Sequence, residues 1–229
     1  MALSKIYPFE CIRVDDEEKK VMEIYKMMVK DGKEEGYTPI IILEDANDLM
    51  QDNVNFAIDD FGSLENFTKE CLKKYKEINI QEYLDSKKEE YEEDNCLTFD
   101  EGDMLFEESN TVYLGEKSDK IYIAKIPTSN PYEVMAYIPM GGFNDCPNNE
   151  IHMALAKVWY DKYGAVPVCI GSDTIQFLLK EPVRGEDELN ELAMQQYLYC
   201  GDIVWQGVQT VNNLENSLSN SKVWYFWWD

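Results

Sequence analysis

The stretch VPVCIGSDTIQFLL, residues 166–179, sets the fold of the second half of this 229-residue chain. Two apolar runs that are rich in β-branched residues flank a short segment of Gly171, Ser172 and Asp173. Strand-forming runs separated by such turn residues are typical of a β-hairpin. The stretch therefore predicts two antiparallel strands, over 166–170 and 174–179, with Asp173 as a turn residue.

Helical and strand patterns surround this hairpin in the rest of the second half. Apolar residues recur at helical spacing in three segments, and Gly164 follows the first of them as a helix stop. Two earlier apolar runs have the composition of strands, and the turn-rich PTSNPY separates them. The predicted elements are strands over 121–126 and 134–138, a helix over 147–163, the hairpin, and helices over 186–200 and 208–219.

The last seven residues, VWYFWWD at 223–229, place aromatic side chains on both alternating faces of a predicted strand. Aromatic residues dominate core burial, and Trp and Tyr are also frequent in binding interfaces. A strand that is aromatic on both faces must be covered on both. We therefore expect most of this cluster to lie in the core and part of it to line a groove or a partner contact.

The first half is predicted to begin with a β-α-β arrangement and to continue with helices. Residues 38–43 are almost wholly apolar, which suits a strand that is covered on both faces. Ser63 is a candidate helix cap, and Asn79 with Glu82 resembles a capping box. The predicted elements are an extended segment over 9–14, a helix over 15–30, the strand over 38–43, a helix after Ser63 and a helix from Asn79 to about Glu93.

Together these elements predict an α+β fold, in which an acidic N-terminal β-α-β-plus-helices half packs on a C-terminal ββαββαα unit. Composition shifts divide the chain into three regions. We expect an acidic α/β region over 1–95, an acidic linker over 96–120, where Gly102 and Gly115 interrupt regular structure, and an α+β domain over 121–229.

The charge of the chain is strongly negative and uneven. It holds 45 acidic and 21 basic side chains, a net charge of −24, and residues 1–120 carry 32 and 15 of these, a net of −17. Phosphate groups are bound by clustered Lys and Arg, so this charge argues against nucleic acid as a partner and equally against anionic membrane surfaces. A basic protein is the partner that the charge favours.

The sequence also suggests a compartment. The N-terminus has no apolar segment of the kind found in secretory signals, and apolar runs such as Ile40 to Leu43 are far too short to span a membrane. The six cysteines form no CxxC pair, so we expect reduced and mostly buried thiols. These features predict a cytoplasmic protein.

Several short motifs in the second half occur in an order that resembles a known family. As a group they resemble the uncharacterised bacterial domain-of-unknown-function family 4253, over about residues 127–229. The resemblance implies a bacterial α+β protein and implies no reaction. The motifs are IPT at 126–128, GGFNDCP at 141–147, WYDKYGA at 159–165, SD at 172–173, YLYCGDIVWQG at 197–207 and WYFWWD at 224–229.

Cys146 is the first candidate for a catalytic residue. It precedes Pro147, which is favoured at the first helical position, so Cys146 would be the N-cap, where amide donors and the helix dipole lower a thiol pKa. His152 is the one histidine of the chain. Six residues along a helix correspond to 240° of rotation, which disfavours a direct Cys146–His152 dyad. Asp202 and Asp173 are the other catalytic candidates, since they lie beside apolar residues and outside the charge runs.

Other functional classes leave weaker signals. Zinc would accept Cys146, Cys200, His152 and Asp202, but these residues lack paired ligand spacing, so we expect no metal and no cofactor. A phosphate-binding loop and a nucleophile elbow are both absent from the sequence. The candidate binding residues gather in two of the motifs and the terminal cluster: Asn144, Asp145, Cys146, Cys200, Asp202, Trp205, Gln206 and Trp228.

The sequence favours a non-enzymatic, acidic protein-binding protein. Neutralisation of a toxin is one form of this function, in which the acidic residues would mimic the phosphates of a nucleic acid. Two alternatives stay open. One is an enzyme with a site around Cys146, Cys200 and Asp202, and the other is a small-ligand-binding module with an aromatic pocket around Trp205 and Trp228.

Overall fold

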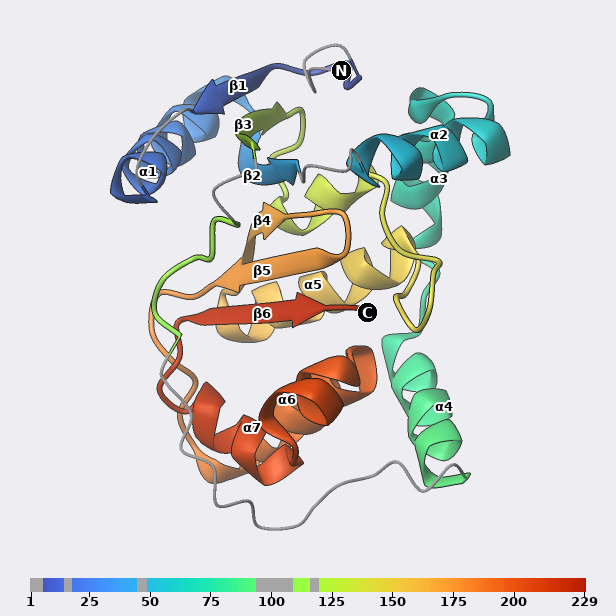
Figure 1. The fold of residues 1–229 in the computed structure, drawn as a ribbon, viewed down its shortest axis with the longest axis vertical. Coiled ribbons are helices and arrows are strands. Elements are labelled where there is room, and N and C mark those ends of the chain that lie inside the picture. Colours follow the sequence, from blue (N-terminus) through green and yellow to red (C-terminus); the bar gives the residue numbers. More distant parts are fainter. Residues whose placement is uncertain (1–5, 15–17, 45–48, 94–108, 116–119) are drawn as a thin grey trace.

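The structure is a computed structural model that describes residues 6–14, 18–44, 49–93, 109–115 and 120–229. Its centre is a mixed six-stranded sheet of strand order β1-β3-β2-β4-β5-β6, with helices on both faces (Figure 1). The predicted α+β class is confirmed. The strands are β1 Cys11–Val14, β2 Thr38–Glu44, β3 Lys120–Ile126, β4 Val166–Ile170, β5 Thr174–Leu178 and β6 Val223–Trp227. The helices are α1 Glu18–Glu35, α2 Leu49–Phe61, α3 Leu64–Lys74, α4 Ile80–Glu93, α5 Asn149–Tyr163, α6 Glu186–Tyr199 and α7 Val211–Leu218.

The two halves of the chain share one sheet. β3 pairs antiparallel with both β1 and β2, so it lies between the two strands that α1 connects. β2 in turn pairs in parallel with β4 and thereby joins β3 to the β4–β5–β6 part of the sheet. Strands from before and after the predicted linker therefore alternate in the sheet. The linker itself, 96–120, lies largely outside the described residues.

β2 is the strand that is most completely covered. All seven of its residues are buried. Ile40 and Ile42 belong to the larger core, whereas Ile41 and Leu43 belong to the smaller core under α1. Side chains alternate between the faces of a strand, so an apolar run of this kind requires a layer on each face. The prediction of a strand covered on both faces is confirmed.

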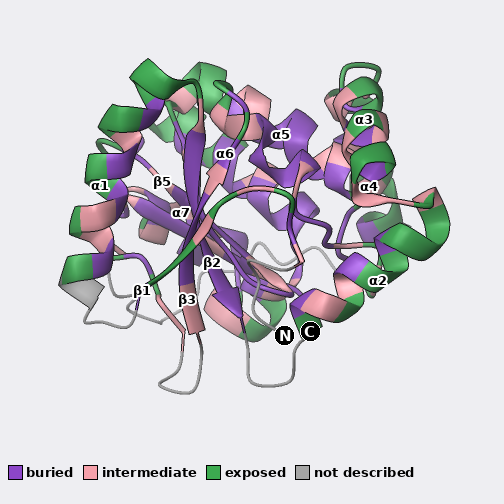
Figure 2. Cartoon of the chain, turned by 90° about the horizontal axis from the view of Figure 1, so that it is seen from above, coloured by how far each residue is buried: buried purple, intermediate pink, exposed green. Residues whose placement is uncertain are grey.

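The larger core is rich in aromatic side chains, which come from α5, α6 and the inward face of β6. Trp159 of α5 is fully buried and stacks on Phe226 at 5.5 Å between ring centroids. Trp224 packs edge to face on Trp159, with 5.5 Å between ring centroids. Trp224 and Phe226, alternate residues of β6, therefore lie in this core, as expected for part of the VWYFWWD segment. Figure 2 shows the buried centre of the fold.

The hairpin and several helix termini agree with the sequence. β4 and β5 pair antiparallel around the Gly171–Asp173 turn, and Gly164 ends α5 with a positive φ of 69°. Ser63 caps α3, because its side chain accepts a hydrogen bond from the backbone N–H of Asn66. Asn79 accepts from the backbone N–H groups of Gln81 and Glu82 at the start of α4.

Three local predictions differ from the structure. The predicted strand over 134–138 is wrong: Pro131–Ala136 form a 3₁₀ helix, with Pro131 in its first turn. Four consecutive residues of that helix are buried, a pattern that a strand with one covered face does not produce. The last helix begins at Val211, because a π-helical segment, Ile203–Val208, precedes it. α2 has no counterpart in the sequence-based elements.

Within the described part of the chain, none of the helices is both long enough and apolar enough to cross a membrane.

Candidate functional site

The residues that sequence analysis singled out converge around the end of β6. The Asp202 carboxylate accepts hydrogen bonds from the backbone N–H of Asp229, at 3.1 Å, and from the Gln206 side chain, also at 3.1 Å. The Asn144 side chain donates to the carbonyl of Asp229 at 2.6 Å. Three of the candidate residues, Asn144, Asp202 and Gln206, are thus held together through a backbone segment that follows β6.

A buried polar cluster lies beside this segment. Cys146 Sγ is 3.7 Å from His152 Nε2, and Tyr199 Oη is 2.6 Å from His152 Nδ1. Trp228 packs edge to face on His152 and Tyr199, with 5.3 Å between ring centroids in both pairs. All four residues are buried, and His152 is 0% exposed.

The expectation that Cys146 and His152 would lie apart is wrong, and so is the expected N-cap. α5 begins at Asn149 with Asn148 as its N-cap, so Cys146 belongs to the preceding turn and the helical rotation of 100° per residue does not apply to it. That turn folds back, since the Cys146 carbonyl accepts a hydrogen bond from the N–H of Gly142 at 3.0 Å. The thiol is thereby directed toward the imidazole.

The electrostatics of the cluster oppose a reactive thiol. Burial raises the pKa of Cys146 well above its usual range, and Cys200 and Asp173 raise it further. Burial also lowers the pKa of His152 to about 3. The cluster therefore holds a protonated thiol and a neutral imidazole at neutral pH. A thiolate nucleophile needs the opposite shift.

Cys200 and Asp173 are structural neighbours of the same region. Cys200 Sγ donates to the carbonyl of Trp227 at 2.9 Å, and burial raises the pKa of this thiol to about 12. The carbonyl of Asp173 accepts from the N–H of Trp228 at 3.2 Å. Across the residues that the structure describes, no group of three or more His, Cys, Asp or Glu is placed to hold a metal ion.

We expect Cys146 and Cys200 in the folded protein to react with a thiol reagent at least about 10³-fold more slowly than free cysteine at pH 7.5. A thiol pKa raised to about 12 lowers the thiolate fraction by about that factor, and burial excludes the reagent further. Mass-spectrometric mapping of alkylated peptides over time measures both rates, and free cysteine in the same reaction is the reference. A Cys146 that alkylates as fast as free cysteine would contradict this structure of the cluster.

The remaining candidates, Asp145 and Trp205, lie at the surface against α4. Lys87 of α4 is 3.7 Å from the Asp145 carboxylate. Trp205 packs on Tyr91 of α4 at 5.0 Å and donates its indole N–H to Tyr197 Oη at 2.8 Å. Trp205 is 37% exposed whereas Trp228 is buried, so the two do not form a shared open pocket.

A surface that sequence analysis missed lies on α2. Three of the large apolar side chains that are exposed within the described residues belong to this one helix: Leu49, Phe56 and Ile58, and Phe56 is 67% exposed. At 100° per residue, Leu49 and Phe56 fall within 20° of each other, and Asp52, Asp59 and Asp60 fall on the same side. The opposite side is buried, through Met50, Val54 and Ala57. We call the residues Leu49, Asp52, Phe56, Asp59 and Asp60 the α2 face.

The α2 face is acidic and has no compensating charge on its own helix. α2 contains no Lys or Arg. Among the described residues, no ion pair involves Asp52, Asp59 or Asp60. The helix lies at the outside of the fold next to α3, and green marks its exposed positions in Figure 2. The i, i+7 spacing of Leu49 and Phe56, flanked by acids, was the sequence signal for this face.

The mixed sheet with helices on both faces, and the buried cluster of Cys146, His152 and Tyr199 beside the end of β6, define an α+β protein. Residues 122–229 match the family model described as "Domain of unknown function (DUF4253)". The resemblance predicted from the motifs is confirmed for this region. The comparisons with curated proteins and with solved structures gave no significant match.

Proposed function

We propose that the protein is a non-enzymatic binding protein that engages a basic protein partner through the α2 face. The observation that carries the proposal is Phe56, an aromatic side chain that is 67% exposed within a group of three aspartates. Aromatic residues contribute a large share of the binding energy in protein interfaces. Aspartates around such an anchor favour a partner with Lys and Arg at the rim of its apolar pocket.

The net charge of −24 supports the same partner class. Long-range attraction between opposite charges accelerates association, and it is weakened by salt. The buried, protonated Cys146 supports a function without a thiol nucleophile. The five described cysteines are free, which suits the reducing cytoplasm of a bacterial cell. Neutralisation of a basic toxin is one form of the proposed function, and competition by RNA for the captured partner identifies it.

We expect Phe56→Ser and the double change Asp59→Asn with Asp60→Asn each to reduce capture of the partner by about tenfold or more, because they remove the apolar anchor and the charged rim respectively. The measurement is a pull-down from source-cell lysate with the tagged chain, at about 0.05 and 0.5 M salt, quantified by mass spectrometry. Both variants replace exposed side chains, so the free energy of unfolding of each is expected to change by less than about 0.5 kcal/mol.

Matched controls lie on α1. Met27→Ser removes an apolar side chain that is 56% exposed, and Glu23→Gln with Glu34→Gln removes two exposed acids. Both controls are expected to capture the partner within about twofold of the unchanged chain. Equal capture by all four variants, or a partner without net positive charge, would show that the α2 face is not the binding surface.

A further inference from the structure

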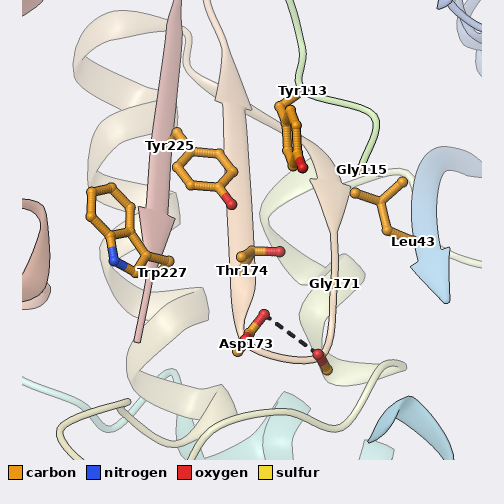
Figure 3. A pocket seen from close by; sticks show the side chains of 9 residues that line it. Leu43, Tyr113, Gly115, Gly171, Asp173, Thr174, Tyr225 and Trp227 are labelled. Atoms are coloured by element: carbon orange, nitrogen blue, oxygen red, sulfur yellow. Dashed lines mark hydrogen bonds between the residues drawn. The ribbon is translucent and has the colours of Figure 1, made fainter. Parts of the chain in front are cut away.

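A pocket of about 480 Å³ lies on the outward side of β5 and β6 (Figure 3). Three aromatic side chains contribute to its lining: Tyr113, Tyr225 and Trp227. Tyr113 and Tyr225 meet edge to face at 5.8 Å between centroids, and Tyr225 and Trp227 lie 5.6 Å apart. Tyr113 is 46% exposed, so this wall is open to solvent.

One formal charge is present among the described residues that line the pocket, and it is negative. Asp173 contributes it, from the turn between β4 and β5. Figure 3 shows its carboxylate at the end of the pocket, next to Thr174, with the aromatic rings beyond it. Ser172 Oγ donates to this carboxylate at 3.4 Å. Burial, together with the charge of Asp173, raises the pKa of Tyr225, so this phenol stays neutral and its ring contributes to the wall at physiological pH.

Aromatic faces next to a carboxylate attract cations. The negative face of an aromatic ring binds an ammonium group within about 6 Å of its centroid, and aromatic walls of this kind recognise quaternary ammonium groups. A carboxylate at the end of the wall adds Coulomb attraction. We infer that this pocket binds an alkylated ammonium group, with Tyr225 and Trp227 as the cation–π surface and Asp173 as the counter-charge.

The same ammonium chemistry has two sources, a free small molecule and a lysine side chain of a protein. Choline is the probe for the first source, and N-acetyl-trimethyllysine methylamide is the probe for the second. The neutral control is 3,3-dimethyl-1-butanol, which has the shape of choline and lacks its charge. The readout is the indole N–H signal of Trp227 in the full chain labelled with ¹⁵N-tryptophan, and the buried Trp159 is the internal reference.

Binding of either cation is expected to shift the Trp227 signal, to leave the Trp159 signal in place, and to be at least about tenfold tighter than binding of the neutral alcohol. Tighter binding of choline identifies a free ligand, and tighter binding of the lysine derivative identifies a side chain. Equal affinity for choline and the neutral alcohol, or no shift at Trp227 with either cation, would overturn the inference.

Variants of the pocket give a second test. Trp227→Leu and Asp173→Asn are each expected to weaken cation binding by about five- to tenfold, whereas Trp227→Phe, which keeps an aromatic face, recovers most of the affinity. Trp205→Leu is the control, since Trp205 lies outside the pocket. For the Trp227 variants, which lack the reporting indole, affinity is measured by calorimetry. Unchanged affinity in Asp173→Asn, a variant that alters one partly exposed turn residue, would also overturn the inference.

Discussion

Gly141→Ala is expected to lower the free energy of unfolding by about 3–5 kcal/mol. Gly141 has a φ of +81°, and a Cβ atom at this position would overlap the carbonyl oxygen of Pro147. His152 Nε2 would lie 3.2 Å from the same Cβ atom. Backbone and a fully buried ring surround the site, so neither neighbour can move away without disturbing the cluster.

Gly36→Ala is the matched control for this prediction. Gly36 has a φ of +80°, and a Cβ atom added there would meet no other atom within 4 Å. Alanine at position 36 therefore has the strain of the left-handed region, about 1–2 kcal/mol, but its Cβ atom overlaps no other atom. Urea denaturation of both variants measures the difference. A cost for Gly141→Ala no greater than that for Gly36→Ala would contradict the close approach of the Gly141 and Pro147 backbones.

The stability of the protein is expected to fall by about 2 kcal/mol between pH 7 and pH 5 through His152 alone. In the unfolded chain this histidine binds a proton near pH 6.5, whereas in the folded protein burial lowers its pKa to about 3. Between these values the unfolded state binds more protons, so protonation favours unfolding as the pH falls. The loss begins near pH 6.5 and continues toward pH 3.

His152→Gln isolates this contribution, because glutamine keeps a polar group in the cluster and does not titrate. The free energy of unfolding of the variant is expected to be lower at pH 7, and its change from pH 7 to pH 5 is expected to be about 2 kcal/mol smaller than that of the unchanged protein. Equilibrium denaturation at pH 7, 6 and 5 gives both curves. Parallel curves would mean that His152 is accessible to protons in the folded state.

Much of the fold was predictable because local patterns matched the tertiary environment. The apolar run of β2 indicated two covered faces, and the Gly171–Asp173 turn indicated the hairpin. The 3₁₀ helix at Pro131 was not predictable from composition, because consecutive burial of Val134, Met135 and Ala136 depends on elements above and below it. The strand order β1-β3-β2 could not be predicted either, since strand order depends on pairing over long sequence separations.

The candidate site was predictable in location more than in chemistry. Motifs distant in sequence supplied Asn144, Cys146, Asp202 and Trp228, and the structure brings them to the end of β6. Their burial, and the resulting direction of the thiol pKa, depend on packing that no motif encodes. The proposed aromatic pocket uses Trp227 instead of Trp228, because the alternation of β6 turns Trp228 inward.

Site-specific photo-cross-linking from the α2 face tests the proposed function most directly. The full chain carrying Phe56→benzoylphenylalanine is irradiated in source-cell lysate at low and high salt, in parallel with Met27→benzoylphenylalanine. We expect a basic protein to be cross-linked from position 56 at low salt, with loss of the product at high salt, and no such product from position 27. The same products from both positions, or an acidic partner at position 56, would contradict a binding function for the α2 face.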